Sequence, residues 1–261
     1  MNSLSISGKN WFLRDFNQDE VNYIKENFSL SEITSKLLTI RKINREDIKS
    51  FLTPSIKNFL PNPNILVDME KSAARAVKSI INNEKIGIFG DYDVDGATST
   101  ALLGNYFSEL GLNYEIYIPD RKKEGYGPSK DSFQHLINKD VKLIFTVDCG
   151  TLSFEAIEFA KKNKVDVIVL DHHQSEIELP QAYSVVNPNR IDDKSNLQYL
   201  CAAGVSFMFL VSLNKHLRSK NWFKEKNLIE PNLLNYLDLV SLGTVCDVVP
   251  LIGLNRAIVK Q

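Results

Sequence analysis

The sequence is poor in cysteine and has no long apolar run. Its 261 residues include three cysteines, Cys149, Cys201 and Cys246, too few and too dispersed for a disulfide framework. No apolar run approaches the roughly 18 residues of a membrane helix, and the first residues lack the apolar core of a secretion signal. These absences predict a cytoplasmic, reduced protein that does not associate with a membrane.

An excess of either charge is missing as well. Lys and Arg number 31 against 32 for Asp and Glu, a net charge of −1. This balance excludes a strongly basic nucleic-acid coat or a polyanionic tail, but it leaves room for a local basic groove. At 43% hydrophobic and 24% charged, the composition is that of a folded globular protein. A Gly-x-x-x-x-Gly-Lys-Ser/Thr phosphate loop is also absent, so nothing suggests a nucleoside-triphosphate site.

Residues 1–62 predict a helical N-terminal segment. Asn17 is expected to cap a first helix, and Ser29 and Glu32 have capping-box spacing at the start of a second. The Pro-Asn-Pro run at residues 61–63 then breaks regular structure, and the domain boundary is placed there.

Residues 63–261 show a different pattern, in which short apolar runs alternate with amphipathic helices. Strands are expected at residues 86–89, 114–118, 141–147 and 165–170. Continuous apolar strands separated by helices are typical of a mostly parallel sheet that helices cover on both faces. The predicted fold class is therefore α/β. Ligands of such sheets bind at the carboxyl ends of the strands.

Acidic residues and histidines follow three of these strands, and an aspartate ends a later apolar helix. They are Asp91, Asp93 and Asp95 after the first strand, Asp148 after the third, Asp171-His172-His173 after the fourth, and Asp247. Carboxylates this close repel one another, and burying them unpaired would be very costly, so a cation is expected. Carboxylates with imidazole and without clustered thiols suit Mn²⁺ or Mg²⁺. This many ligands is typical of two ions about 3.5–4 Å apart.

Plainer interpretations compete for the same residues. Asp-x-Asp-x-Asp-Gly also opens an EF-hand loop, but Leu102 stands where that loop needs a bidentate Glu. The run could also be a solvated acidic turn, and Asp148 or Asp247 alone would fit a cap or turn. Cys149 and Cys246 adjoin candidate ligands and could coordinate a metal, although cysteines beside a site are more often small buried fillers.

Taken together, the motifs resemble the DHH phosphoesterase superfamily and, within it, the RecJ-like exonucleases specific for single-stranded DNA. The resemblance runs from about Leu60 to the C-terminus. It is carried by residues 90–103 (GDYDVDGATSTALL), 118–121 (IPDR), 124–127 (EGYG), 171–173 (DHH), 186–188 (VNP), 201–205 (CAAGV) and 243–251 (GTVCDVVPL). Several ordered motifs of this length are a stronger signal than an isolated Asp-His-His.

The resemblance implies metal-dependent 5′→3′ hydrolysis of single-stranded DNA in DNA repair and recombination, with two Mn²⁺ or Mg²⁺ ions as cofactors. A single-strand-binding protein and a helicase are implied as partners. His173 would contact the scissile phosphate, and Arg121 would hold a phosphate of the strand. Asp91 would be either a metal ligand or a carboxylate that contacts the ligands without binding the metal. The implied metal ligands are Asp93, Asp95, Asp148, His172 and Asp247.

The sequence departs from the RecJ-like pattern at its C-terminal end. Proteins of that kind continue with a DHH-associated domain and an oligonucleotide-binding fold, and neither is evident in residues 63–261. Apolar residues that would pack against the continuation are therefore expected to be exposed, namely Leu254, Ile258 and Val259.

Three other functions remain open at this point. Another DHH hydrolase, acting on short oligonucleotides, cyclic dinucleotides or pyrophosphate, would share the fold and the metals. A haloacid-dehalogenase-type phosphatase built on Asp93 and Asp95 would place Thr where Ala97 stands. A non-catalytic DNA-replication scaffold of the same fold would have lost ligands, whereas this set is intact.

Overall fold

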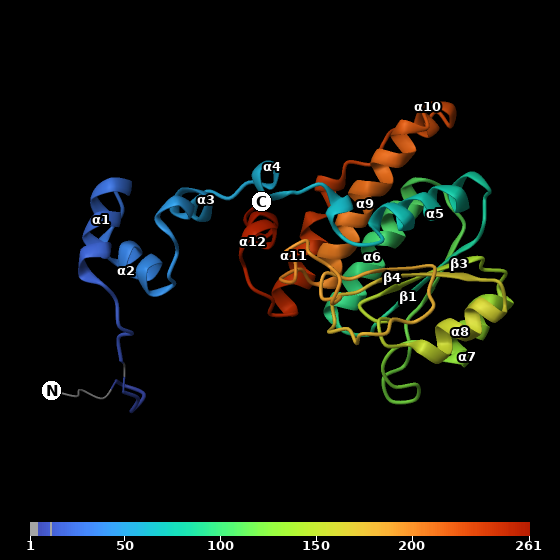
Figure 1. Ribbon diagram of the computed structural model, residues 1–261, viewed down its shortest axis with the longest axis horizontal. Coiled ribbons are helices and arrows are strands. Elements are labelled where there is room, and N and C mark those ends of the chain that lie inside the picture. The colour runs from blue at the N-terminus through green and yellow to red at the C-terminus, as the bar shows by residue number, and fades with distance from the viewer. Residues whose placement is uncertain (1–4, 11) are drawn as a thin grey trace. The chain divides into compact units, whose positions relative to one another are not determined.

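The computed structural model describes residues 5–10 and 12–261, which form two compact units divided between Ser55 and Ile56 (Figure 1). The smaller unit contains α1 (Gln18–Phe28), α2 (Glu32–Ile40), η1 (Arg45–Asp47) and α3 (Ile48–Leu52). Its core is formed by Ile24, Leu38 and Ile48. Asn17 caps α1 as predicted, because its side chain accepts hydrogen bonds from the Asp19 and Glu20 N–H groups.

The predicted capping box at Ser29 is wrong. Ser29 ends α1 in the left-handed conformation, with a φ of 52°. Ser31 is the residue that caps α2, since its side chain accepts a hydrogen bond from the Thr34 N–H. Both serines precede the same apolar stripe, so the pattern alone did not distinguish them. Because Ser29 adopts the left-handed turn that ends α1, Ser31 is the serine placed to cap α2.

The larger unit is built on a parallel sheet, which confirms the predicted α/β class. In the described residues the sheet has the order β2-β1-β3-β4-β5, and every neighbouring pair is parallel. The strands are β1 (Ile86–Gly90), β2 (Tyr114–Tyr117), β3 (Leu143–Val147), β4 (Asp166–Leu170) and β5 (Ser184–Val186). The sequence pattern did not reveal β5, because three residues are too few for a recognisable apolar run.

Helices cover both faces of the sheet (Figure 1). Helices α5 (Met69–Ile81), α6 (Val94–Glu109), α9 (Ala202–Ser219) and α11 (Leu237–Cys246) share one core, and α7 (Lys130–Asn138) and α8 (Phe154–Lys162) the other. Adjacent strand residues divide between the cores, Phe145 packing in the first and Ile144 in the second. Because helices bury both faces of the sheet, the polar residues that follow the strands lie together at the carboxyl edge of the sheet.

Two short elements join the larger unit near its beginning: α4 (Ile56–Phe59) and η2 (Pro63–Ile65). Ile56, Phe59 and Leu60 pack against its apolar core, and contacts assign everything from Ile56 onward to this unit. The sequence had placed residues up to 62 with the N-terminal helices, because the proline run is the visible break.

The C-terminal part of the chain is better packed than its sequence suggested. After α10 (Trp222–Glu225) and η3 (Leu233–Tyr236), the chain ends in α12 (Gly253–Lys260), which packs against α11 and α4. Leu254 and Ile258 are buried, so their predicted exposure is wrong, whereas Val259 is exposed as predicted. Among the described residues, no helix combines the length and apolar character needed to span a membrane.

Candidate metal centre

The loop after β1 carries three aspartates into the first turn of α6. Asp93 caps this helix, because its Oδ1 accepts a 2.9 Å hydrogen bond from the Gly96 N–H. The helix therefore begins at Val94, directly after this cap. A Cβ on Gly96 would lie 2.5 Å from the Asp91 backbone oxygen, so only glycine allows this tight turn.

Asp95 is held by the N-terminus of α9. Its Oδ2 accepts a 2.6 Å hydrogen bond from the Ala202 N–H, and its Oδ1 accepts a 2.9 Å bond from the Ala203 N–H. Each oxygen keeps a second lone pair for another partner. Burial raises the pKa of Asp95 despite these bonds. The fold therefore fixes the direction of this carboxylate before any ligand binds.

Asp148 follows β3 in a backbone conformation that residues other than glycine rarely adopt, with a φ of 61°. The Tyr126 hydroxyl donates a 3.1 Å hydrogen bond to the Asp148 carbonyl, and the Asp148 N–H donates to the Leu170 carbonyl. Burial, together with the charge of the neighbouring Asp95, raises the pKa of Asp148 to about 11. Backbone strain of this kind is common where a side chain must be aimed at a site.

Asp171 organises the two histidines that follow β4. Its Oδ1 accepts the His172 N–H at 2.7 Å and lies 2.8 Å from His173 Nδ1, while its Oδ2 accepts the Thr151 N–H at 3.1 Å. Burial opposes ionisation of Asp171, but the hydrogen bonds from His173 and Thr151, together with the charge of His173, outweigh burial and lower the pKa of Asp171. The hydrogen bond with Asp171 also raises the pKa of His173. Asp171 thereby fixes the ring of His173, a role that the sequence analysis did not assign.

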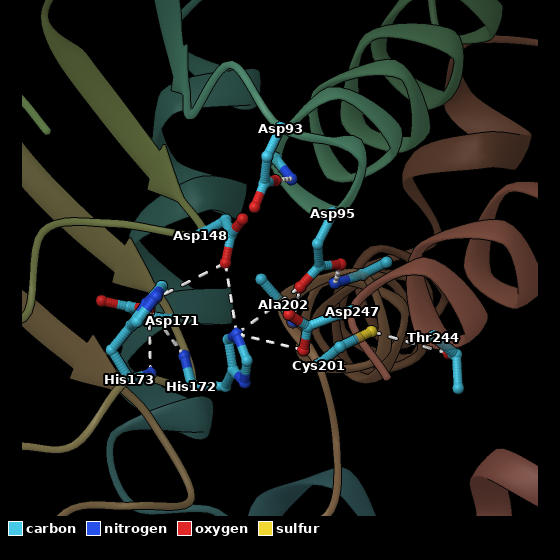
Figure 2. Close-up of polar contacts among 12 residues, drawn as sticks. Asp93, Asp95, Asp148, Asp171, His172, His173, Cys201, Ala202, Thr244 and Asp247 are labelled. Carbon is cyan, nitrogen blue, oxygen red and sulfur yellow. Dashed lines mark hydrogen bonds and ion pairs between the residues drawn. The ribbon is translucent and has the colours of Figure 1, made fainter. Parts of the chain in front are cut away.

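The predicted ligands converge at the carboxyl edge of the sheet, although they come from different elements (Figure 2). His172 Nε2 lies 3.3 Å from Asp148 Oδ1, 3.6 Å from Asp247 Oδ2 and 3.7 Å from Asp95 Oδ2. Three groups have donor atoms within 4.8 Å of one another: Asp95–His172–Asp247, Asp91–Asp93–Asp148 and Asp148–His172–His173. Asp148 belongs to two of these groups, so it can serve two neighbouring sites.

The donor atoms in this cluster fit a divalent cation. Four of them are buried without a hydrogen-bond partner: Asp91 Oδ1, Asp148 Oδ1, His172 Nε2 and Asp247 Oδ2. Burial also raises the pKa values of Asp91 and Asp247, so the carboxyl groups would tend to hold protons without a nearby positive charge. A cation supplies that charge and satisfies the orphaned atoms. An oxygen-rich set with imidazole suits Mn²⁺ or Mg²⁺.

The cysteines stay outside this arrangement. Within the described ranges, no group of candidate ligands includes a cysteine. Cys149 is buried with its Sγ 3.5 Å from the Val147 carbonyl oxygen, Cys201 packs 3.5 Å from Thr244 Oγ1, and Cys246 is exposed. Thiolate ligation therefore finds no support.

Arg121 lies outside the ligand cluster, in the exposed loop after β2. Its guanidinium is 5.2 Å from the centroid of the Tyr92 ring, and Tyr92 stands between Asp91 and Asp93 in the acidic loop. Lys122 beside it is also exposed. Arg121 is thus placed near the rim of the site, and its role in phosphate binding stays a prediction.

Asn187 is a further residue whose role the sequence analysis missed. It is fully buried after β5, and its Nδ2 donates to Thr151 Oγ1 at 2.9 Å and to the His173 carbonyl at 2.8 Å. Its Oδ1 accepts the Asn189 N–H, and Asn189 Nδ2 donates to the His172 carbonyl. The Val-Asn-Pro sequence was visible, but only the fold shows that it clamps the backbone of both histidines.

Replacing Asn187 should weaken the site without unfolding the chain. Asn187→Asp keeps the acceptor for Asn189 and loses both donors, so the histidine backbone loses support. We expect about a tenfold loss of Mn²⁺ affinity, the lower end of what outer-shell changes cause. Calorimetric titration with Mn²⁺ measures this, with Asn163→Asp on the exposed end of α8 as the control. Unchanged affinity in Asn187→Asp would show that the clamp is dispensable.

A family model described as the DHH family, N-terminal domain, matches residues 85–244. The single-stranded-DNA-specific exonuclease RecJ of Escherichia coli is 38% identical over 211 residues, 80% of this chain and 36% of that protein. The Bacillus subtilis RecJ is 33% identical over 249 residues, 95% of this chain and 30% of the relative. The chain thus spans about a third of the length of these relatives.

Solved structures agree with these matches. A crystal structure of exonuclease RecJ bound to manganese is similar with a TM-score of 0.63 and 34% identity, covering 75% of this chain and 47% of that one. RecJ from Thermus thermophilus in complex with Mn²⁺ gives a TM-score of 0.71 and 28% identity, covering 94% of this chain and 33% of that one.

Proposed function

Since the chain belongs to the DHH family, we propose that its larger unit is the catalytic part of a metal-dependent exonuclease that degrades single-stranded DNA from the 5′ end. The observation that carries this proposal is the set of four orphaned donor atoms at the carboxyl edge of the sheet. Similarity to single-stranded-DNA-specific exonucleases supports the choice of substrate.

We assign the two cation sites to two of these ligand groups, one that contains Asp148 and one that lies beside it. One would be held by Asp95, His172 and Asp247, the other by Asp91, Asp93 and Asp148. Manganese or magnesium in related structures supports these ions. When bound, such ions supply an activated water and neutralise charge on the phosphate oxygens.

The residues outside the ligand set would position the substrate. Asp171 holds Nδ1 of His173, so the other ring nitrogen, Nε2, points away from the Asp171 carboxylate. The raised pKa of His173 favours the imidazolium form, which would donate a hydrogen bond to a non-bridging phosphate oxygen. The exposed guanidinium of Arg121 would hold a phosphate of the same strand in its fork.

The proposal extends to the cellular setting of the protein. The three free cysteines suit a reducing compartment, and we place the activity in the cytoplasm. Single-stranded DNA would reach the enzyme after a helicase opens a duplex, with a single-strand-binding protein covering the product strand. A pull-down from purified components tests each of these two partners separately.

Digestion of single-stranded DNA labelled at one end tests the proposed function directly. With Mn²⁺ or Mg²⁺, a 5′ label should appear first as a mononucleotide, whereas a 3′ label should remain on long fragments until late. The 5′ label is found in the first product only if cleavage starts at the 5′ end. A matched duplex should resist digestion, because its termini are paired.

Other results would select the alternatives. Release of the 3′ label first would contradict the polarity. Hydrolysis restricted to short oligonucleotides, a cyclic dinucleotide or pyrophosphate would indicate another hydrolase of the family. Binding of DNA and Mn²⁺ with no hydrolysis of any of these substrates would indicate a scaffold.

A further inference from the structure

A pocket adjoins the candidate metal centre on the side of His173. It has a volume of about 610 Å³, within the roughly 300–1,000 Å³ typical of small-molecule sites. The pocket lies between the loop that carries Tyr126 and the start of α8, and Asp171 and His173 form the wall that it shares with the metal centre. A Cβ on Gly127 would lie 3.7 Å from Ser153 Oγ, so the loop and the helix approach each other closely here.

The outer walls of the pocket are apolar and exposed. Leu152 is 50% exposed, Phe154 is 39% exposed and Tyr126 is 55% exposed. Single exposed apolar residues are ordinary on a protein surface, but these three line one pocket beside a highly polar site. An aromatic ring and a leucine side chain at a pocket mouth offer a surface against which a flat ring can stack.

The charges of the pocket disfavour a phosphate as its occupant. Apart from His173, which the proposed function assigns to the scissile phosphate, no cationic side chain is among the described residues that line it, whereas two lining residues, Asp171 and Glu155, are acidic. Asp171 is already engaged with His173, and Glu155 pairs with Lys130 at 2.9 Å. A neutral, flat group therefore matches these walls better than an anion does.

The floor of the pocket offers polar groups for recognition. Ser153 lines it, and its hydroxyl makes no capping hydrogen bond to α8, whereas the neighbouring Thr151 is already bonded to Asp171 and Asn187. A few polar groups among apolar walls are typical of sites that orient a small ring system. Nucleobases combine a stacking face with hydrogen-bonding edges, so they satisfy both parts of this pocket.

We propose that this pocket receives the nucleobase of a nucleotide next to the scissile phosphate, stacked on Phe154 and Leu152. This inference rests on the proposed function, because it takes His173 to contact that phosphate. A base can enter only when it is unpaired and unstacked from its neighbours. The pocket would therefore contribute to the preference for single strands, in addition to any contact with the sugar-phosphate backbone.

Fluorescence of 2-aminopurine tests the proposal. Single-stranded oligonucleotides with this base at each position near the 5′ end are bound to the chain in Ca²⁺, which suits oxygen ligands and is used here to prevent cleavage. We expect one position to be quenched on binding, and Phe154→Ala and Leu152→Ala to remove that quenching. An abasic nucleotide at the same position should weaken binding about tenfold in the natural chain and not in Phe154→Ala. Unchanged quenching in both variants would overturn the proposal.

The controls separate this inference from the proposed function. Ile229→Ala replaces an exposed apolar residue in the segment after α10, so quenching should persist. Hydrolysis of an oligonucleotide whose 5′-terminal positions are all abasic, and which therefore has no ring to stack there, should be equal in Phe154→Ala and the natural chain. If oligonucleotides bind and are cleaved but no position is quenched, the pocket proposal fails alone. If neither binding nor hydrolysis occurs, the proposed function fails, and this inference fails with it.

Discussion

Replacing Asp148 by alanine should reduce hydrolysis by about 10³-fold or more while the chain stays folded. Its carboxylate is a ligand of one proposed cation site, Asp91–Asp93–Asp148, and its Oδ1 lies 3.3 Å from His172 Nε2 of the other, so the change removes a donor from the first site and a neighbouring charge from the second. Charge stabilisation by a bound ion contributes several kcal/mol, and each 1.36 kcal/mol corresponds to a factor of ten in rate. Single-turnover digestion of labelled single-stranded DNA, together with Mn²⁺ titration, measures both losses.

The metal-free stability of Asp148→Ala separates a lost ligand from a lost fold. Burial and the neighbouring charge of Asp95 raise the pKa of Asp148, which means that its ionised form is unfavourable here without a cation. The variant should therefore melt no lower than the natural chain in the absence of metal, and added Mn²⁺ should raise its melting temperature less. Asp131→Ala, at an exposed position in α7, is the control. Near-normal turnover and Mn²⁺ affinity in Asp148→Ala would refute its role.

Replacing Gly96 by alanine should destabilise the larger unit and disrupt the cation sites together. The new Cβ would meet the Asp91 backbone oxygen at 2.5 Å and the Asp91 Cα at 2.8 Å, and neither atom can move without shifting the loop. Overpacking of this kind costs typically about 1–3 kcal/mol, and more where the backbone itself must yield. We expect a lower free energy of unfolding in urea and loss of the Mn²⁺-dependent rise in melting temperature.

Gly104→Ala on the same helix provides a matched comparison. A Cβ there would lie 3.4 Å from Ile116 Cδ1, the flexible end of a side chain. Alanine is also more favourable than glycine in the interior of an α-helix, by about 1 kcal/mol. Gly104→Ala should therefore be neutral or stabilising and should bind Mn²⁺ normally. If Gly96→Ala behaved like Gly104→Ala, the tight approach of the loop to α6 would not be required.

Much of the architecture follows from local sequence. The apolar runs that became β1, β3 and β4 are long enough to be recognised, and each is followed at once by acidic or imidazole residues. Gly111, which follows the C-cap of α6, has a φ of 65°, a conformation that costs glycine little. Because parallel strands place their carboxyl ends at one edge, the motifs by themselves predict a shared site.

Other features depend on contacts between distant segments, which no local pattern reveals. The sequence did not show that Leu254 and Ile258 would be buried, since their burial depends on how α12 packs against α11 and α4. It also did not reveal β5, whose three residues are stabilised by pairing with β4.

The finer geometry of the site was likewise decided by the tertiary structure. Sequence identified Asp95 and His172 as candidate ligands, but the hydrogen bonds that aim Asp95 come from the α9 N-terminus, 107 positions away. Asn187 acts on the histidine backbone only because β5 lies beside β4. Residue type fixes which donors are available, whereas the direction of each donor depends on hydrogen bonds and packing across the fold.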